Sequence, residues 1–258
     1  MNDTTNGRKP FSRKWIVLSL IAFPILAAVL IYGILILTMP DVEILKKQNP
    51  GQTALMQLRI QAAAEKGRRF RVKQQWVAFS QIPELMKKTV RISEDANFYF
   101  HEGIDLDELE ESIKRNLEEG DFIRGGSTIT QQLAKNLYLS TEKSLWRKIR
   151  EYLIARELET HLSKNRIYQI YLNVIEFGNG IFGVGAAAEY FFHKPVGELS
   201  SEEIIRLTAI IPRPLKTNPT EDSKWLLWRC RWITKKLLLY KYIEQQEYDY
   251  LIIRFTIA

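Results

Sequence analysis

The feature that most constrains this chain is a long uncharged segment near its N-terminus. No residue from Trp15 to Met39 is charged, and a helix needs only about 20 apolar residues to cross the hydrocarbon core of a bilayer. Pro24 and Gly33 lie within the segment, and both residue types are tolerated in a membrane helix. The sequence therefore predicts a transmembrane helix over residues 15–39.

A cleaved signal peptide is the alternative interpretation of the same segment. The apolar region of a signal peptide is shorter, about 7–15 residues, and an Ala-x-Ala-like cleavage site follows it. Here the segment ends in Thr38-Met39-Pro40-Asp41, so an uncleaved anchor is favoured. Residues 1–14 are polar, with basic side chains at positions 8, 9, 13 and 14. These charges predict a cytoplasmic tail, with the chain from Asp41 onward outside the membrane.

The composition limits the number of domains and the class of partner. A chain of 258 residues with 46% apolar content can form one sizeable domain with an appendage, and 26% charged residues exclude a multi-span membrane protein. The net charge of +7 indicates an anionic partner; nucleic acid, anionic lipid and a pyrophosphate-bearing substrate all fit. The single cysteine, Cys230, excludes an intrachain disulfide and a cysteine-based zinc site.

The rest of the chain predicts a basic stalk with some helix over residues 40–75 and one mainly α-helical domain over residues 76–258. A short strand is expected at residues 76–79. Amphipathic periodicity and capping residues predict the helices. They are expected from Pro83 toward Glu94, over 105–119, from Ser127 or Thr128 through Asn136, from Ser140 or Thr141 to about Ser163, over 164–177, from Gly183 through Ala188, over 202–211 and from about Asp222.

Glu94 is the first candidate for proton-transfer chemistry. It stands at the end of an apolar helix and just before Phe98 and Tyr99, and packing beside aromatic rings would desolvate the carboxylate and make it a better proton acceptor. The alternative is an acidic helix end or surface pair formed with Asp95. His101 is expected to fix a turn, because the three histidines of the chain lack the spacing of metal ligands.

Residues 125–132, which read Gly-Gly-Ser-Thr-Ile-Thr-Gln-Gln, are typical of an anion site. Two glycines let the backbone approach a ligand closely, and the helix that follows presents free amides to it. Ser127, Thr128 and Gln131 add neutral donors, and Lys135 lies one turn beyond Gln131 on the same face. An ordinary glycine turn followed by a capped helix is the alternative.

Glu151 follows Lys148 by three residues and Arg147 by four, so one helical stripe carries two cations and a carboxylate. A surface ladder of ion pairs would contribute only about 0.3–0.5 kcal/mol per pair. The alternative is a second active-site carboxylate, balanced by cations that hold a departing pyrophosphate. Spacing alone leaves both interpretations open.

Two further motifs are expected to be structural. Residues 178–183 match the G-x-G-x-x-G dinucleotide fingerprint, but a helix precedes them and no β-α-β alternation surrounds them, so a tight turn with close helix packing is predicted. Near the C-terminus, Trp225, Trp228 and Trp232 share one helix face, interleaved with Arg229, Arg231, Lys235 and Lys236. Such a stripe can bind single-stranded nucleic acid, but a core face is expected here, with membrane contact as the second choice.

Taken together, these motifs resemble the peptidoglycan glycosyltransferase domain of class A penicillin-binding proteins (glycosyltransferase family 51). The anchored single-domain layout resembles the monofunctional biosynthetic peptidoglycan transglycosylases. The resemblance runs from about Trp76 to Leu239 and implies a two-lobed, mainly α, lysozyme-like domain. It rests on Glu-Asp-x-x-Phe-x-x-His-x-Gly at 94–103, the glycine segment at 125–132, Arg-Lys-x-x-Glu at 147–151, and Ser-Lys-x-x-Ile with Tyr-Leu-Asn at 163–173.

The resemblance also implies the substrate and the roles of the site residues. The substrate would be lipid II, a disaccharide-pentapeptide on undecaprenyl pyrophosphate. Glu94 would be the general base, and Glu151 a second carboxylate that helps to order the pyrophosphate. A divalent cation, Mg²⁺ or Mn²⁺, is expected at Glu94, Asp95 or Glu151, with no organic cofactor. The residues implied for phosphate and donor binding are Ser127, Thr128, Gln131, Gln132, Lys135, Asn136, Lys143, Arg147 and Lys148.

The implied partners are lipid II, the nascent glycan strand, the membrane and other cell-wall synthesis proteins, and no nucleic acid. The implied location is the bacterial plasma (inner) membrane, with one span and a periplasmic catalytic domain. The alternatives are a lysozyme-like hydrolase or lytic transglycosylase, which would gain nothing from a phosphate-binding set of cations, and an inactive anchored scaffold.

The chain departs from the family pattern at two places, and it also matches one motif of a different domain. Lys143 stands where some relatives carry arginine, so it keeps the charge but loses the bidentate fork. Arg229-Cys230-Arg231 stands where the family has paired arginines. Residues 140–143 match the Ser-x-x-Lys of penicillin-binding active sites, but Lys216-Thr217-Asn218 is not Lys-Thr-Gly, so no transpeptidase domain is expected.

Overall fold

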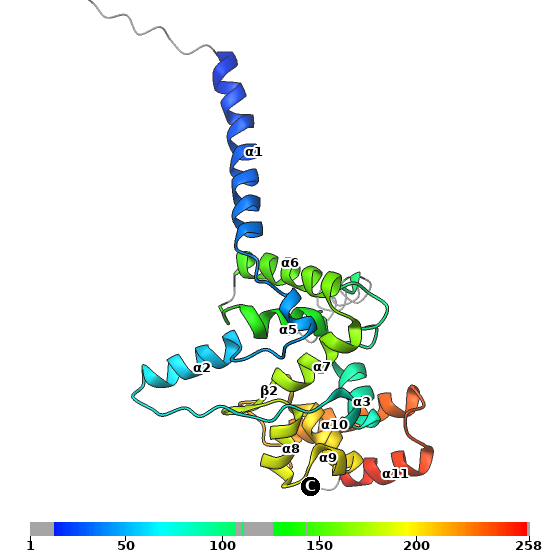
Figure 1. Cartoon of the computed structure of the whole chain (residues 1–258). Coiled ribbons are helices and arrows are strands. Elements are labelled where there is room, and N and C mark those ends of the chain that lie inside the picture. The colour runs from blue at the N-terminus through cyan, green and yellow to red at the C-terminus, as the bar shows by residue number, and fades with distance from the viewer. Residues whose placement is uncertain (1–12, 107–109, 111–125, 143, 257–258) are drawn as a thin grey trace, which may run out of the picture. The chain divides into compact units, whose positions relative to one another are not determined.

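The computed structural model describes residues 13–106, 110, 126–142 and 144–256 (Figure 1). The chain forms two compact units, Met1–Pro40 and Asp41–Ala258. The described part of the first unit contains α1 (Arg13–Leu37), a helix of 25 residues with Pro24 inside it. Among the described residues, no helix meets the combined length and hydropathy required of a membrane span.

The second unit is mainly α-helical, as predicted. Its described helices are α2 (Ala54–Ala64), α3 (Glu84–Glu94), α5 (Ile129–Tyr138), α6 (Leu145–His161), α7 (Lys164–Val174), α8 (Val184–Phe192), α9 (Ser201–Ile210), α10 (Lys224–Leu239) and α11 (Gln245–Arg254). Short 3₁₀ turns cover Glu43–Lys46, Phe79–Gln81 and Val196–Glu198. The helix predicted over 105–119 lies almost entirely outside the described residues.

Hydroxyl side chains cap the N-termini of most of the described helices. Thr128 accepts a hydrogen bond from the Gln131 backbone N–H, and the Gln131 side chain accepts one in return, which forms a capping box at the start of α5. Ser200 and Glu203 form another at α9. The predicted cap of α6 was wrong: Ser144, not Ser140 or Thr141, accepts from the N–H three residues on and so begins the helix.

A small sheet joins distant parts of the chain. Its strands are β1 (Lys73–Gln74), β2 (Glu176–Gly178) and β3 (Ile181–Phe182), in the order β1-β3-β2, with β1 parallel to β3 and β2 antiparallel to it. The strand predicted at 76–79 was wrong. The backbone N–H and C=O of Val77 bond instead to the Asn173 side chain, at 2.7 and 3.0 Å, so they are not available to a sheet ladder.

The segment expected as a stalk packs onto the helical unit. Helix α2 lies against α5, and Leu55 and Met56 form a buried cluster with Phe182. Arg59 donates two hydrogen bonds, of 2.8 and 2.7 Å, to the buried carboxylate of Glu176. The compact unit therefore extends back to Asp41.

The glycine fingerprint serves close packing, as predicted. Helix α7 ends at Val174, earlier than expected, because β2 and β3 form a hairpin directly after it. Gly183 follows the hairpin with φ +80°, and a Cβ there would lie 2.4 Å from the carbonyl oxygen of Asn173. Only glycine combines this backbone conformation with so close an approach.

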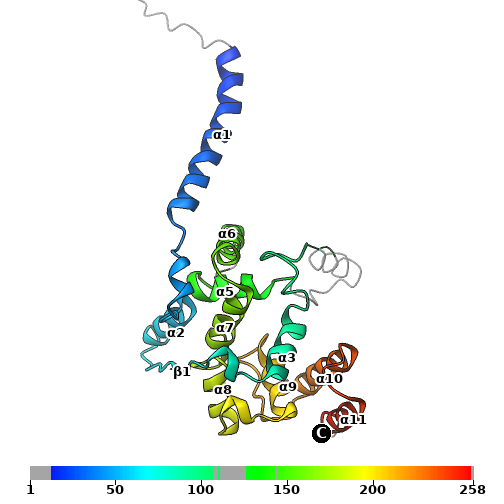
Figure 2. The same ribbon diagram turned by 45° about the vertical axis from the view of Figure 1, so that its right-hand side comes forward.

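The helices of the second unit form two groups that frame the site. In one group α5 packs against α2, α6 and α7; in the other α9 packs against α3 and α10, and α10 against α11. In Figure 2, α7 of the first group lies below α5 and above α8, and its Tyr168 and Tyr171 are among the largest fully buried side chains. This mainly helical arrangement with few strands is consistent with a lysozyme-like domain.

Candidate active site

A cavity of about 720 Å³ lies where the two helix groups meet. Its walls come from the end of α3, the start of α5, the end of α9 and one face of α10. The lining includes Ser93, Glu94, Asp95, Asp105, Gly126, Ser127, Thr128, Gln132, Lys135, Pro212, Trp228, Arg229, Trp232 and Lys236. Five of the residues predicted for catalysis or binding therefore line one cavity: Glu94, Ser127, Thr128, Gln132 and Lys135.

Glu94 is the last residue of α3, and its side chain is 9% exposed. Three neutral or cationic donors face its two oxygens at moderate distances: Ser93 Oγ at 3.2 Å, Gln132 Nε2 at 3.3 Å and Arg229 Nη2 at 3.4 Å. Burial raises the pKa of Glu94 above its usual value, while Arg229, Gln132 and Ser93 act to lower it. The direction is the one that a general base requires.

The tyrosine of the Tyr-Leu-Asn motif supports this arrangement from α7. Tyr171 donates its hydroxyl hydrogen to Gln132 Oε1 at 2.9 Å, which orients the amide so that Nε2 points toward Glu94 Oε2. Tyr171 is fully buried. A residue of α7 thus fixes a side chain of α5 that contacts the end of α3.

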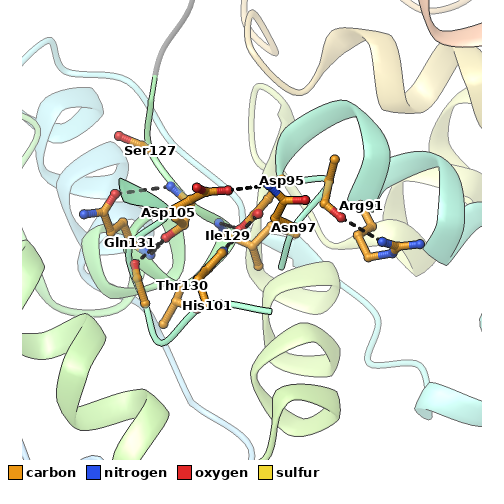
Figure 3. A network of polar contacts seen from close by, with 12 residues as sticks. Arg91, Asp95, Asn97, His101, Asp105, Ser127, Ile129, Thr130 and Gln131 are labelled. Carbon is orange, nitrogen blue, oxygen red and sulfur yellow. Dashed lines mark hydrogen bonds and ion pairs between the residues drawn. The ribbon is translucent and has the colours of Figure 1, made fainter. Parts of the chain in front are cut away.

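Asp95 connects the ends of two of these helices (Figure 3). Its Oδ2 accepts a hydrogen bond of 2.9 Å from the backbone N–H of Ile129, the first residue of α5. The Nε2 atom of His101 lies 3.0 Å from Asp95 Oδ1, and the His101 carbonyl accepts a hydrogen bond from Lys164. His101 therefore holds a turn, as expected from the sequence.

The side chains of Thr128 and Gln131 make hydrogen bonds that cap the N-terminus of α5. The Thr128 hydroxyl donates to the carbonyl of Gly103 at 2.7 Å, and Gln131 Oε1 accepts from the Thr128 N–H at 3.2 Å. Gln131 and Asn136 are buried and do not line the cavity. Of the neutral side chains that the resemblance implied for donor binding, Ser127, Thr128 and Gln132 therefore line the cavity.

Glu151 is a buried carboxylate rather than part of a surface ladder. Its side chain is 4% exposed, and Arg147 Nη1 and Lys148 Nζ each lie 2.5 Å from one of its oxygens. Lys148 Nζ also lies 3.0 Å from the Ser127 hydroxyl, which lines the cavity. Glu151 itself does not line the cavity, so it acts on the site through the two cations that it orients.

Lys135 interacts electrostatically with both acids, Glu94 and Glu151. Burial lowers the pKa of Lys135, as do the neighbouring charges of Arg147 and Lys148, whereas Glu151 and Glu94 raise it. The Lys135 side chain lines the cavity. Together with the start of α5 and with Arg147 and Lys148 of α6, which lie behind Ser127, it forms a cationic wall. Such a wall is suited to a phosphate-like group.

The carboxylates expected to hold a divalent cation are engaged in other contacts. Both oxygens of Glu151 are paired with cations, and Glu94 faces Arg229. Among the described residues, one group brings three ligand atoms within 4.8 Å: Asp95, His101 and Asp105. Its oxygens already accept hydrogen bonds from Ile129 and Asn97. These carboxylates therefore already have protein partners among the described residues.

Comparison with known proteins assigns the family. The sequence model described as Transglycosylase matches residues 61–238, more than half of the chain. The chain belongs to the transglycosylase family. It is 40% identical over 189 residues to a protein named "Biosynthetic peptidoglycan transglycosylase" from Nitrosospira multiformis, covering 73% of this chain and 82% of that protein. A protein of the same name from Chromobacterium violaceum is 39% identical over 224 residues, covering 85% and 97%.

The match to the family model extends through most of α10, where the residues missed by sequence reasoning lie. Helix α10 was expected to bury its tryptophans, but its core face consists of Leu226, Leu227, Cys230, Ile233, Thr234 and Leu237. Trp228 is 51% exposed and lines the cavity together with Arg229 and Trp232. The aromatic and basic residues that share one stripe of this helix could have indicated a cavity wall, but the stripe was interpreted as a core face.

Two members of the predicted transglycosylase site lie outside the described residues. These are Lys143 and the first glycine of the Gly-Gly turn, at position 125. Gly126, the second glycine, lines the cavity beside Ser127.

Proposed function

We propose that this protein is a membrane-anchored peptidoglycan glycosyltransferase that polymerises lipid II into β-1,4-linked glycan strands and releases undecaprenyl pyrophosphate. One observation carries the proposal. A buried carboxylate with a raised pKa, Glu94, and a cationic wall that includes Lys135 line the same cavity. Membership of the transglycosylase family, with relatives named biosynthetic peptidoglycan transglycosylases, supports it.

The proposed reaction is a single displacement at the anomeric carbon of the donor sugar. The 4-hydroxyl oxygen of the acceptor sugar attacks that carbon, its proton passes to Glu94, and the bond from the carbon to the pyrophosphate oxygen breaks. The leaving pyrophosphate is α-linked and the new bond is β, so the centre inverts. Burial favours this proton transfer, because it makes the neutral form of Glu94 less costly.

Charge on the leaving pyrophosphate develops on the side of the cationic wall. Lys135 would meet it directly, and Arg147 and Lys148 would add charge from behind Ser127. Preorganised cations stabilise such a transition state because they need no reorganisation during the reaction. Glu151 keeps Arg147 and Lys148 in place, so its role is to position cations rather than to transfer a proton.

The decisive assay incubates the full-length protein in detergent with lipid II and, separately, with finished glycan. A glycosyltransferase lengthens strands from lipid II, whereas a hydrolase or lytic transglycosylase shortens finished glycan. Glu94→Gln should reduce the rate of polymerisation about 10²–10⁴-fold, because the base is lost. The matched control is Glu84→Gln at the exposed start of the same helix, which should leave the rate unchanged.

An inactive scaffold makes the opposite prediction for the same pair of variants. Wild-type protein would then make no strands from lipid II, and Glu94→Gln would support cell-wall growth as well as the wild type does. Adding Mg²⁺, Mn²⁺ or EDTA to the polymerisation assay measures the requirement for a divalent cation directly.

The anchor, the location and the partners are part of the proposal. The uncharged residues 15–39 lie mostly within α1, and a membrane anchor suits a substrate that cannot leave the bilayer. The basic residues before the segment support a cytoplasmic N-terminus and a periplasmic domain. Membrane fractions washed with alkaline carbonate should retain the full chain. Protease added outside spheroplasts should cut the domain but spare a tag at the N-terminus.

A further inference from the structure

Arg229 reaches the proposed base from the α10 side of the cavity. Its Nη2 atom donates a 3.0 Å hydrogen bond to Ser93 Oγ and lies 3.4 Å from Glu94 Oε1. The Arg229 side chain is 16% exposed, so this charge is only partly screened by water. Helices α3 and α10 pack against each other, and this packing brings together residues that are 135 positions apart.

Arg229 is also held by contacts that do not depend on the charge of Glu94. Its guanidinium lies 4.5 Å from the centre of the Trp232 ring, one helical turn along α10. The Lys236 ammonium lies 4.2 Å from the same ring centre and donates to the carbonyl of Ile92 at 3.1 Å. Cation–π contacts of this kind fix the direction of a guanidinium. Arg229 is therefore expected to stay in place while the neighbouring carboxylate gains and loses a proton.

We propose that Arg229 is a positioning residue that holds the Glu94 carboxylate in the orientation and the anionic form that accept the proton of the sugar hydroxyl. This inference rests on the proposed glycosyl transfer. The two oxygen atoms of the Glu94 carboxylate then have different partners. Oε1 faces Ser93 and Arg229, and Oε2 faces the Gln132 amide. The carboxylate is thus fixed from α3, α5 and α10 at once.

The other charged and titratable groups around Glu94 do not duplicate this role. Asp95, which follows it in the chain, is an anion and raises the Glu94 pKa. Tyr168 and Tyr171 on α7 are neutral phenols whose own pKa values burial raises well above the usual range. Lys135 on α5 interacts with Glu94 electrostatically, but no hydrogen bond joins the two. Among the described residues, Arg229 is the cation in direct contact with the base.

The test is a pH–rate profile of lipid II polymerisation by full-length wild type, Arg229→Gln and Arg229→Lys. Glu94 must be ionised to act, so activity is lost as the pH falls through its pKa. Removing Arg229 removes the contact that lowers this pKa, so the acid limb of Arg229→Gln should move upward by roughly one pH unit or more. The plateau rate should also fall about tenfold, because the carboxylate loses its fixed orientation.

Arg229→Lys keeps the charge without the planar fork, so it should return the acid limb to the wild-type position and restore only part of the plateau rate. Lys235→Gln is the matched control, since it removes an exposed cation from the same helix and should leave the profile unchanged. If Arg229→Gln does not fold, as judged by circular dichroism, Arg229→Met is measured in its place. Its apolar side chain keeps the packing of the arginine stem without the charge, so the same upward move of the acid limb is expected.

The inference is overturned if Arg229→Gln lowers the rate by one factor at every pH, or if Arg229→Lys restores neither the limb nor the plateau. Either result would mean that Arg229 serves the packing of α10 alone. Failure of the wild type to polymerise lipid II is a separate outcome, which refutes the proposed function and not only this role of Arg229.

Discussion

Replacing Glu151 by glutamine tests the electrostatics of the cationic wall most sharply. An exposed ladder of ion pairs would lose only about 0.3–0.5 kcal/mol per pair, whereas breaking a fully buried pair costs about 3–5 kcal/mol. The Glu151 side chain is buried and the Arg147 side chain is 18% exposed, but that of Lys148 is 45% exposed. Water therefore screens part of the effect, and we expect a loss of about 2–3 kcal/mol in the free energy of unfolding.

The assay is urea-induced unfolding of the full-length protein in detergent, for Glu151→Gln, Arg147→Met and the double variant. The double-mutant cycle isolates the pairwise energy, which we expect to be at least about 1.5 kcal/mol. Glu157→Gln is the matched control on the same helix. Its carboxylate lies 3.3 Å from His161 and is 44% exposed, so the loss should stay within about 0.5 kcal/mol.

A coupling energy of about 0.5 kcal/mol or less between Glu151 and Arg147 would refute this reasoning. It would show that water reaches the pair and that the cations of α6 are not held by a buried anion. The polymerisation rate gives an independent check, because Glu151→Gln should lower kcat while Glu157→Gln should not.

Three further predictions concern the base, the cationic wall and the packing. The pH profile of kcat/KM should be bell-shaped. It should rise through the pKa of Glu94, which burial raises, and fall through the pKa of Lys135, which burial lowers. Lys135→Arg should move only the alkaline limb of the profile, to higher pH. Asn173→Ala should cost about 2–4 kcal/mol in urea unfolding, since Val77 loses both backbone partners; the exposed Asn165→Ala is the control. Gly183→Ala should destabilise strongly by clashing with the Asn173 carbonyl, whereas Gly51→Ala, which meets open space, should be neutral in the same unfolding assay.

The helical part of the fold could be predicted because local signals agree with tertiary packing. The apolar positions of α3 face the core, and Thr128 and Ser200 cap α5 and α9 as their residue types predict. The sheet could not be predicted in this way. Lys73 pairs with Ile181 across more than 100 positions, and a two-residue strand has no periodicity of its own.

In the candidate site, too, residues in local motifs could be predicted and contacts made by tertiary packing could not. Glu94, Ser127 and Lys135 were singled out because each stands in a short motif that carries the family resemblance, and the structure brings all three to one cavity. The burial of Glu151 could not be derived from spacing, since a carboxylate three and four residues from two cations has the same pattern on a buried face as on an exposed one. Arg229 was not assigned a role, because its contact with Glu94 exists only once α10 has packed against α3.

The two acids of the site differ in the strength of their partners, and this difference supports a different proposed role for each. Glu94 has one cation, 3.4 Å away, and two neutral donors at 3.2 and 3.3 Å. Glu151 has two cations at 2.5 Å. A carboxylate with weak partners and a raised pKa can take up a proton at little cost. A carboxylate that balances two cations serves best by keeping its charge, because those cations would otherwise repel each other beside Lys135. The surroundings of each acid, rather than its residue type, therefore support the proposed roles of Glu94 as the base and of Glu151 as the support of the cationic wall.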